Sequence, residues 1–156
     1  MRSIMVAIKP QWCELIFAGK KTREVRKTLP NIGEPFRAYI YATKSNPPWI
    51  RFCAEGAIQL SGAVVGEFVC NEFDRFFYME MSTFAREIRR KAMLTVKDLR
   101  KYAGNFEMLY AWHISELKEY NEPLDVGDFL NNNGDIMKRP PQSWQYVIPK
   151  FNLNKQ

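Results

Sequence analysis

The sequence contains a single histidine, His113, among its 156 residues. This removes multi-histidine metal sites and makes Ser-His or Cys-His catalysis a remote prospect, since a lone histidine is more often packed or exposed than catalytic. The three cysteines, Cys13, Cys53 and Cys70, are odd in number and widely spaced. They resemble neither a disulfide framework nor a zinc knuckle. We therefore expect no metal, no cofactor and a reducing, cytoplasmic environment.

Long hydrophobic runs are also missing from the chain. The N-terminus lacks the apolar core of a signal peptide, and no segment approaches the roughly 20 apolar residues that cross a bilayer. Internal repeats, low-complexity tracts and linker-like shifts in composition are absent too. With 46% apolar residues in 156, the chain is long enough to bury one core. We expect one domain over residues 1–156 and no membrane association.

Positive charge is present in excess, and it is concentrated near the N-terminus. The first 30 residues hold seven Lys/Arg against two acidic residues, whereas the other 126 hold sixteen against fifteen. The run from Gly19 to Lys27 alone contains five cations and one carboxylate, Glu24. A basic surface attracts anionic partners such as nucleic acid, although many charged runs are only solvated.

Hydrophobic spacing predicts more strands than helices. An apolar run at 4–8 predicts a strand, and Pro10 with Trp12, Leu15 and Ile16 predicts a helix that ends at Gly19. Further strands are expected at 22–27, 36–43, 63–70, 109–115 and 143–148, and helices at 82–93 and from 95 to 104. Residues 44–48, Gly56 and Gly62 are interpreted as loop and turn, and the polar stretch before residue 143 as an ordered loop. This order predicts a mixed sheet curled into a small barrel.

Four residues carry a resemblance to a known family. Gly19, Lys21, Glu24 and Arg26 match the GxKxxExR pattern of the ASCH domain, which belongs to the PUA-like superfamily. The elements around them follow the family's order, so the resemblance covers most of residues 4–72. Residues 112–115 and 140–144 also resemble segments of longer, often phage-borne ASCH proteins.

The resemblance implies an α+β fold, with a PUA-like mixed β-barrel of five or six strands flanked by helices. The resemblance also implies a cleft beside the first helix. It implies an RNA-related role too, because PUA-like domains are generally RNA binders. Independently of the resemblance, the two helices expected from the sequence make residues 73–104 a helical insert.

Residues near this motif are the candidate ligand contacts. Because alternate residues of a strand share a face, Thr22, Glu24 and Arg26 are expected together, with Lys21 at the hinge before them. Lys21, Glu24 and Arg26 are suited to grip a phosphate or a base edge; the alternative is a surface ion pair worth little. Lys9 precedes the first helix and is a further candidate for a contact with the ligand; the alternative is an ordinary surface lysine.

Aromatic and hydroxyl side chains of other strands are further candidates. Tyr39 and Tyr41 share a strand face that would suit a stacked base, although core packing is the more ordinary role for at least one of them. Thr43, Trp112, Ser143 and Trp144 are candidates for the cleft wall, or else for packing and turns.

Three functions are consistent with these residues. The first is an RNA- or nucleotide-binding domain with a basic cleft. The second is a metal-independent hydrolase of an N-acylated nucleoside or of RNA, with Lys21 and Glu24 as proton-transfer groups. The family's amidases place a threonine nucleophile three residues after the lysine, where this chain has Glu24. The third is a protein-interaction domain. The cluster Arg86 to Lys91 is either an accessory basic face or a solvated helix surface.

Overall fold

Strand β1 (Ser3–Ile8) lies inside a six-stranded sheet in the computed structural model, which describes residues 1–31 and 35–151. The strand order is β10-β11-β1-β3-β6-β9. Its other members are β3 (Phe36–Ala42), β6 (Ala63–Cys70), β9 (Ser115–Leu124), β10 (Phe129–Leu130) and β11 (Trp144–Pro149). Only β1 and β3 run parallel, so the sheet is mixed, as the sequence predicted.

Both faces of this sheet are buried, which explains the continuous apolar run of β1. Helix α1 (Pro10–Phe17) packs Cys13 and Ile16 against Ile4, Val6 and Ile8 on one face. Met5 faces the other way, into a cluster with Phe129 and Val147 that the C-terminal third of the described chain contributes. A short 3₁₀ turn, η1 (Val126–Asp128), leads into β10 on that side.

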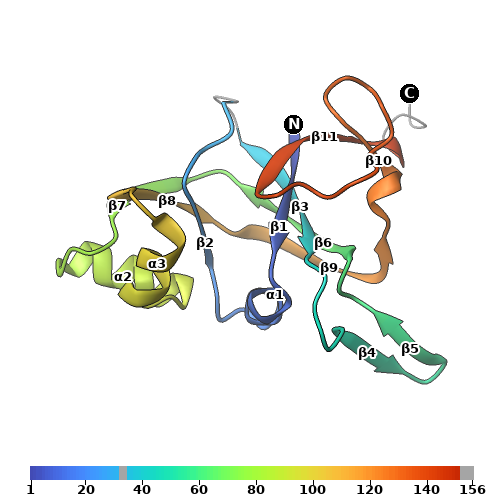
Figure 1. Ribbon diagram of the computed structural model, residues 1–156, viewed down its shortest axis with the longest axis horizontal. Helices are drawn as coiled ribbons and strands as arrows, with labels where there is room; N and C mark the ends of the chain where they lie inside the picture. Colours follow the sequence, from blue (N-terminus) through green and yellow to red (C-terminus); the bar gives the residue numbers. More distant parts are fainter. Residues whose placement is uncertain (32–34, 152–156) are drawn as a thin grey trace.

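A second sheet carries two helices on one face. Its order is β2-β8-β7, formed by β2 (Arg23–Arg26), β8 (Met108–His113) and β7 (Phe73–Phe77). Val25, Phe76 and Ala111 pack there against α2 (Thr83–Ala92) and α3 (Val96–Ala103). Figure 1 shows these helices beneath β7 and β8 at one end of the molecule. The insert at 73–104 therefore contains both predicted helices, preceded by a strand.

Helix ends follow their sequence signals. The Ser82 side chain caps α2, and Thr95 with Asp98 forms the predicted capping box of α3. Beyond the last turn of α1, Gly19 adopts a left-handed φ of 75°, which glycine reaches at little steric cost. The chain can therefore reverse there into β2.

Two of the loop predictions are wrong. Residues 115–124 form β9, which is an edge strand with one side open to water. An edge strand tolerates polar residues, so the polar composition of this segment did not predict a strand. The stretch from 44 to 62 contains a hairpin of β4 (Ile50–Cys53) and β5 (Gly56–Gln59), which projects away from α2 and α3 in Figure 1. Among the described residues, no helix is long and apolar enough to cross a membrane.

Candidate functional site

Lys21, Glu24 and Arg26 are buried charged side chains at the join between α1 and β2. Their exposed fractions are 2%, 6% and 7%. After Gly19 the chain folds back on α1, and the backbone N–H of Lys21 donates to the Leu15 carbonyl over 3.0 Å. This turn aims the Lys21 side chain at the C-terminal end of α2.

The Lys21 ammonium is held by one strong hydrogen bond. Its Nζ donates to the backbone oxygen of Ala92 over 2.7 Å, and it lies 5.4 Å from the centre of the Trp12 ring. Burial lowers the pKa of Lys21 because water no longer solvates the cation; the negative charge of Glu24 acts in the opposite direction, and Arg26 adds to the lowering. The ammonium is thus easier to deprotonate than an exposed lysine.

Glu24 and Arg26 form an ion pair on one face of β2, two residues apart. Arg26 Nε and Nη2 lie 3.1 and 3.0 Å from Glu24 Oε1. The guanidinium also donates to the Ala7 carbonyl over 2.7 Å and to Ser143 Oγ over 3.2 Å. Arg26 therefore ties β2 to β1 and to the start of β11.

The other carboxylate oxygen of Glu24 is unsatisfied. Oε2 is buried and accepts no hydrogen bond from any described residue. It lies 3.9 Å from Lys21 Nζ, which is beyond hydrogen-bonding distance. The buried Glu24 Oε2 and the Lys21 ammonium, which has further N–H donors, thus lie near each other without forming a hydrogen bond.

These groups line a cleft of about 360 Å³ between the end of β1, α1, β2 and α3. Its charged lining is four cations against two carboxylates, which favours an anionic ligand. The lining residues are Ala7, Ile8, Lys9, Gln11, Trp12, Lys21, Glu24, Val25, Arg26, Leu94, Asp98, Leu99, Lys101 and Tyr102.

Part of this lining was missed in the sequence. Trp12 fits the apolar stripe of α1, so the pattern gave no reason to place it in a cleft. Lys101 and Tyr102 belong to α3, which reaches β2 only through the packing of the insert. No local signal connects α3 with the motif.

Of the other candidates, Lys9 lines the cleft and is exposed at the start of α1. Ser143 lies close by through its bond to Arg26, and the indole of Trp144 donates to Thr28 Oγ1 over 3.0 Å. Thr22 lies outside the lining, with its backbone bonded to Lys91 and Ile114. The ligand-binding roles of all these residues stay predictions.

Four further candidates also lie outside this lining. Trp112 is fully buried in the cluster beneath α1, and its indole nitrogen has no partner among the described residues. Tyr39 and Tyr41 are 2% and 3% exposed and pack in the cluster on the other face of the main sheet, so neither offers a ring to a base. Thr43 directly follows β3, and its backbone N–H donates to the carbonyl of Ile8.

Two other predicted features have structural partners. His113 lies between carboxylates, 2.7 Å from Asp74 and 3.3 Å from Glu72. Within the Arg86 to Lys91 cluster, Arg89 is buried and donates to two backbone carbonyls, of Tyr78 and Glu80. The accessory basic face is therefore smaller than the sequence suggested.

The structure of this chain is similar to solved structures of other proteins. An ASCH protein from Zymomonas mobilis is 20% identical, with a TM-score of 0.68 over 99% of this chain and 92% of that one. Two mutants of the Zymomonas protein are 18% identical, with TM-scores of 0.69 and 0.68; they cover 99% and 98% of this chain, and 96% and 93% of their own. No protein-family model and no curated protein matches the sequence. The chain therefore has the α+β fold of these ASCH structures, which confirms the predicted fold class.

Proposed function

We propose that the cleft binds one nucleotide or nucleoside unit, either free or within RNA. The unsatisfied Glu24 Oε2 beside Lys21 carries this proposal. The edge of a nucleobase presents a donor next to an acceptor. Such an edge would donate to Glu24 and accept from Lys21, and so satisfy both groups at once.

Shape and charge support the same ligand. A volume of about 360 Å³ is in the range of small-molecule sites. Trp12 and Tyr102 supply aromatic surface on which a base can stack. Lys9 and Lys101 add positive charge for a phosphate. The resemblance of the motif to the ASCH domain, together with the shared fold, is consistent with an RNA-related ligand.

Binding of cytidine 5′-monophosphate and of a labelled single-stranded RNA, measured by calorimetry and fluorescence anisotropy, tests the proposal. Glu24→Gln and Lys21→Met should each weaken binding by about tenfold or more, because each removes a charged hydrogen-bonding partner. Glu87→Gln and Lys118→Met make the same chemical changes at exposed positions and should leave affinity unchanged. Equal affinity of all four variants and the wild type would reject the cleft as the binding site.

Hydrolysis of an N-acylated nucleoside is a second candidate, favoured by the lowered pKa of Lys21 next to Glu24. Among the described lining residues there is no serine or threonine to act as nucleophile. Water would therefore attack the amide carbon with Glu24 accepting its proton, and Lys21 would stabilise the oxyanion. The C–N bond then breaks as Glu24 passes this proton to the departing nitrogen, giving the free nucleoside and a carboxylic acid.

N4-acetylcytidine incubated with the protein in EDTA tests this candidate, with release of cytidine followed by chromatography. Turnover should disappear in Glu24→Gln and persist in Glu87→Gln. No release of cytidine by the wild type would remove the hydrolase and leave the binding proposal standing.

A further inference from the structure

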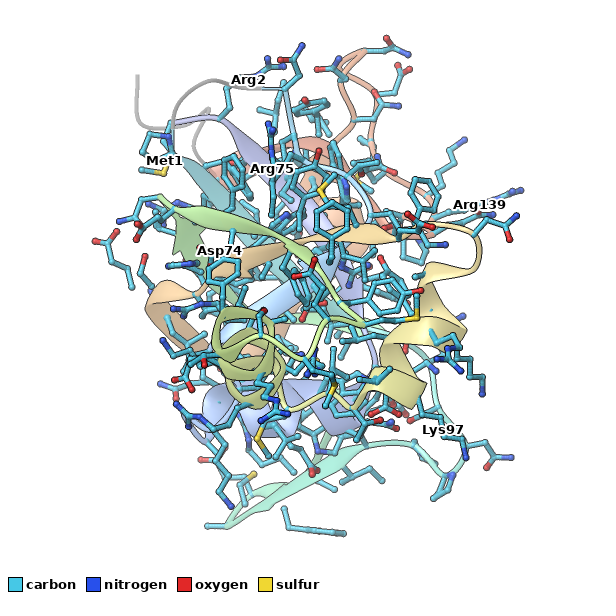
Figure 2. All side chains as sticks on the ribbon, turned by 90° about the vertical axis from the view of Figure 1, so that its left-hand side faces the viewer. Met1, Arg2, Asp74, Arg75, Lys97 and Arg139 are labelled. Carbon is cyan, nitrogen blue, oxygen red and sulfur yellow. The ribbon has the colours of Figure 1, made fainter. Side chains whose placement is uncertain are left out.

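The second sheet exposes aromatic and basic side chains on the face opposite its helices. Along β7, Asp74 and Phe76 lie on the side of α2 and α3, whereas Phe73, Arg75 and Phe77 lie on the other. In Figure 2, Arg75 is seen above β7 and Asp74 on the side of the helices. Phe73 and Phe77 are 42% and 52% exposed.

Strand register joins this face to the cleft. Tyr110 of β8 pairs with Arg26 of β2 on one side and with Arg75 of β7 on the other. Side chains directly opposite across strands lie about 5 Å apart at Cβ. The Arg75 guanidinium carbon lies 5.9 Å from the centre of the Tyr110 ring, and the Phe73 and Tyr110 rings meet edge to face at 6.1 Å. Phe73, Arg75, Phe77 and Tyr110 are called the platform below.

The platform belongs to a segment of the chain that is rich in exposed apolar groups. Among the described residues, fifteen large hydrophobic side chains are exposed, and eight of them fall between residues 73 and 106. Isolated exposed hydrophobics are ordinary, but a concentration of them marks an interaction site. Phe73 and Phe77 belong to the platform, with Arg75 between them on β7, whereas α2 and α3 lie on the opposite face of this sheet. The platform is therefore aromatic and carries one positive charge.

We propose that the platform binds single-stranded RNA next to the nucleotide held in the cleft, an inference that rests on the proposed function. Unpaired bases stack on exposed aromatic rings of a sheet, with nearby arginine at the phosphates. Arg75 lies between two exposed phenylalanines, and Tyr110 connects it to Arg26 at the cleft. A second copy of the chain fits this surface less well, because each copy carries a net charge of +6 and so repels the other.

Anisotropy of a fluorescein-labelled octauridine, compared with calorimetry of cytidine 5′-monophosphate, tests the proposal. Phe73→Leu and Phe77→Leu keep apolar surface but remove the ring, and each should weaken octauridine binding by about tenfold while leaving the mononucleotide unaffected. Arg75→Gln should also reduce the dependence of log K on log salt concentration by about 0.7 for one lost phosphate contact. Phe52→Leu is the matched control, since Phe52 is 83% exposed on the separate β4–β5 hairpin.

Each result decides the proposal. Unchanged octauridine binding in the platform variants, or equal weakening of both ligands, would overturn it. Binding of cytidine 5′-monophosphate without octauridine would also overturn it but leave the cleft proposal intact, whereas binding of neither would reject both. Light scattering measures self-association of the protein. Self-association that is lost in Phe77→Leu, while anisotropy shows unchanged octauridine affinity, would assign the surface to a second copy instead.

Discussion

At the scale of single residues, two cations and one carboxylate are buried together at the start of β2. Lys21 and Arg26 each lie beside Glu24, and Arg26 also bonds to Ala7 and Ser143. Burying charge costs free energy unless the charges are paired and hydrogen-bonded. Glu24 is the only carboxylate within salt-bridge distance of either cation among the described residues.

Removal of the Glu24 charge should therefore destabilise the fold. Glu24→Ala leaves two buried cations without a counter-charge and should lower the free energy of unfolding by about 3–5 kcal/mol, as for other broken buried pairs. Urea unfolding measures this change. Glu87→Ala, at an exposed carboxylate on α2, should leave the midpoint nearly unchanged. A Glu24→Ala protein as stable as wild type would contradict this prediction. It would mean that water, or a backbone group that moves closer, stabilises the two cations in place of Glu24.

At the scale of elements, α1, β6 and β9 approach one another closely around Gly66. A Cβ built on Gly66 of β6 would lie 2.5 Å from the backbone oxygen of Lys118 in β9 and 2.7 Å from the Phe17 ring at the end of α1. Only a residue without a side chain lets these elements meet. Since α1 carries Trp12 and leads to Lys21, this contact also helps to position one wall of the cleft.

Gly66→Ala should destabilise the protein by about 1–3 kcal/mol through overpacking. Gly127→Ala is the control, because a Cβ there meets nothing within 4 Å. Thermal unfolding of the two variants measures the difference. Equal melting temperatures would contradict this prediction and would show that α1 can move away from β6 at little cost. In that case the nucleotide affinity of Gly66→Ala should fall, because Trp12 and Lys21 move with the helix.

At the scale of the whole molecule, alkaline pH acts on several buried or partly buried groups at once. Burial is the main cause of a raised pKa at six phenols and thiols: Tyr39, Tyr41, Tyr102, Tyr120, Cys13 and Cys70. For Cys70 the pKa rises from 9.0 to about 11. In the unfolded chain these groups lose protons near their ordinary values of 9.0 and 10.0, whereas the folded chain retains them. Stability contributed by these groups is therefore complete below pH 9 and falls as pH rises further.

Lys21 acts in the opposite direction, because its pKa is lowered from 10.5 by burial, so its contribution to stability rises with pH up to that value. As pH rises, the six phenols and thiols lower the stability of the fold and Lys21 raises it. The melting temperature should therefore fall by several degrees between about pH 8 and about pH 10.5. Calorimetry across this range measures the fall. A Lys21→Met protein should lose more stability over this range than wild type, because the one opposing group is gone. A constant melting temperature would contradict the burial of these phenols and thiols.

Local rules predicted the elements whose signals lie within a few residues. The Thr95–Asp98 capping box, the end of α1 near Gly19 and strand β6 at 63–70 all occur as expected. β9 was missed because an edge strand needs no apolar alternation, and β7 because its exposed Phe73 and Phe77 obscure the buried face.

By itself, the sequence determined that Glu24 and Arg26 share a face, because the period of a strand is two residues, and its GxKxxExR spacing predicted the fold class. Only the tertiary structure decided what surrounds them. Tyr102 and Lys101 reach the cleft because α3 packs beside β2, whereas Tyr41 is buried because the C-terminal third of the described chain covers its face of the main sheet. These contacts join segments more than 70 residues apart, and their free energy comes from burial against partners that no local pattern specifies.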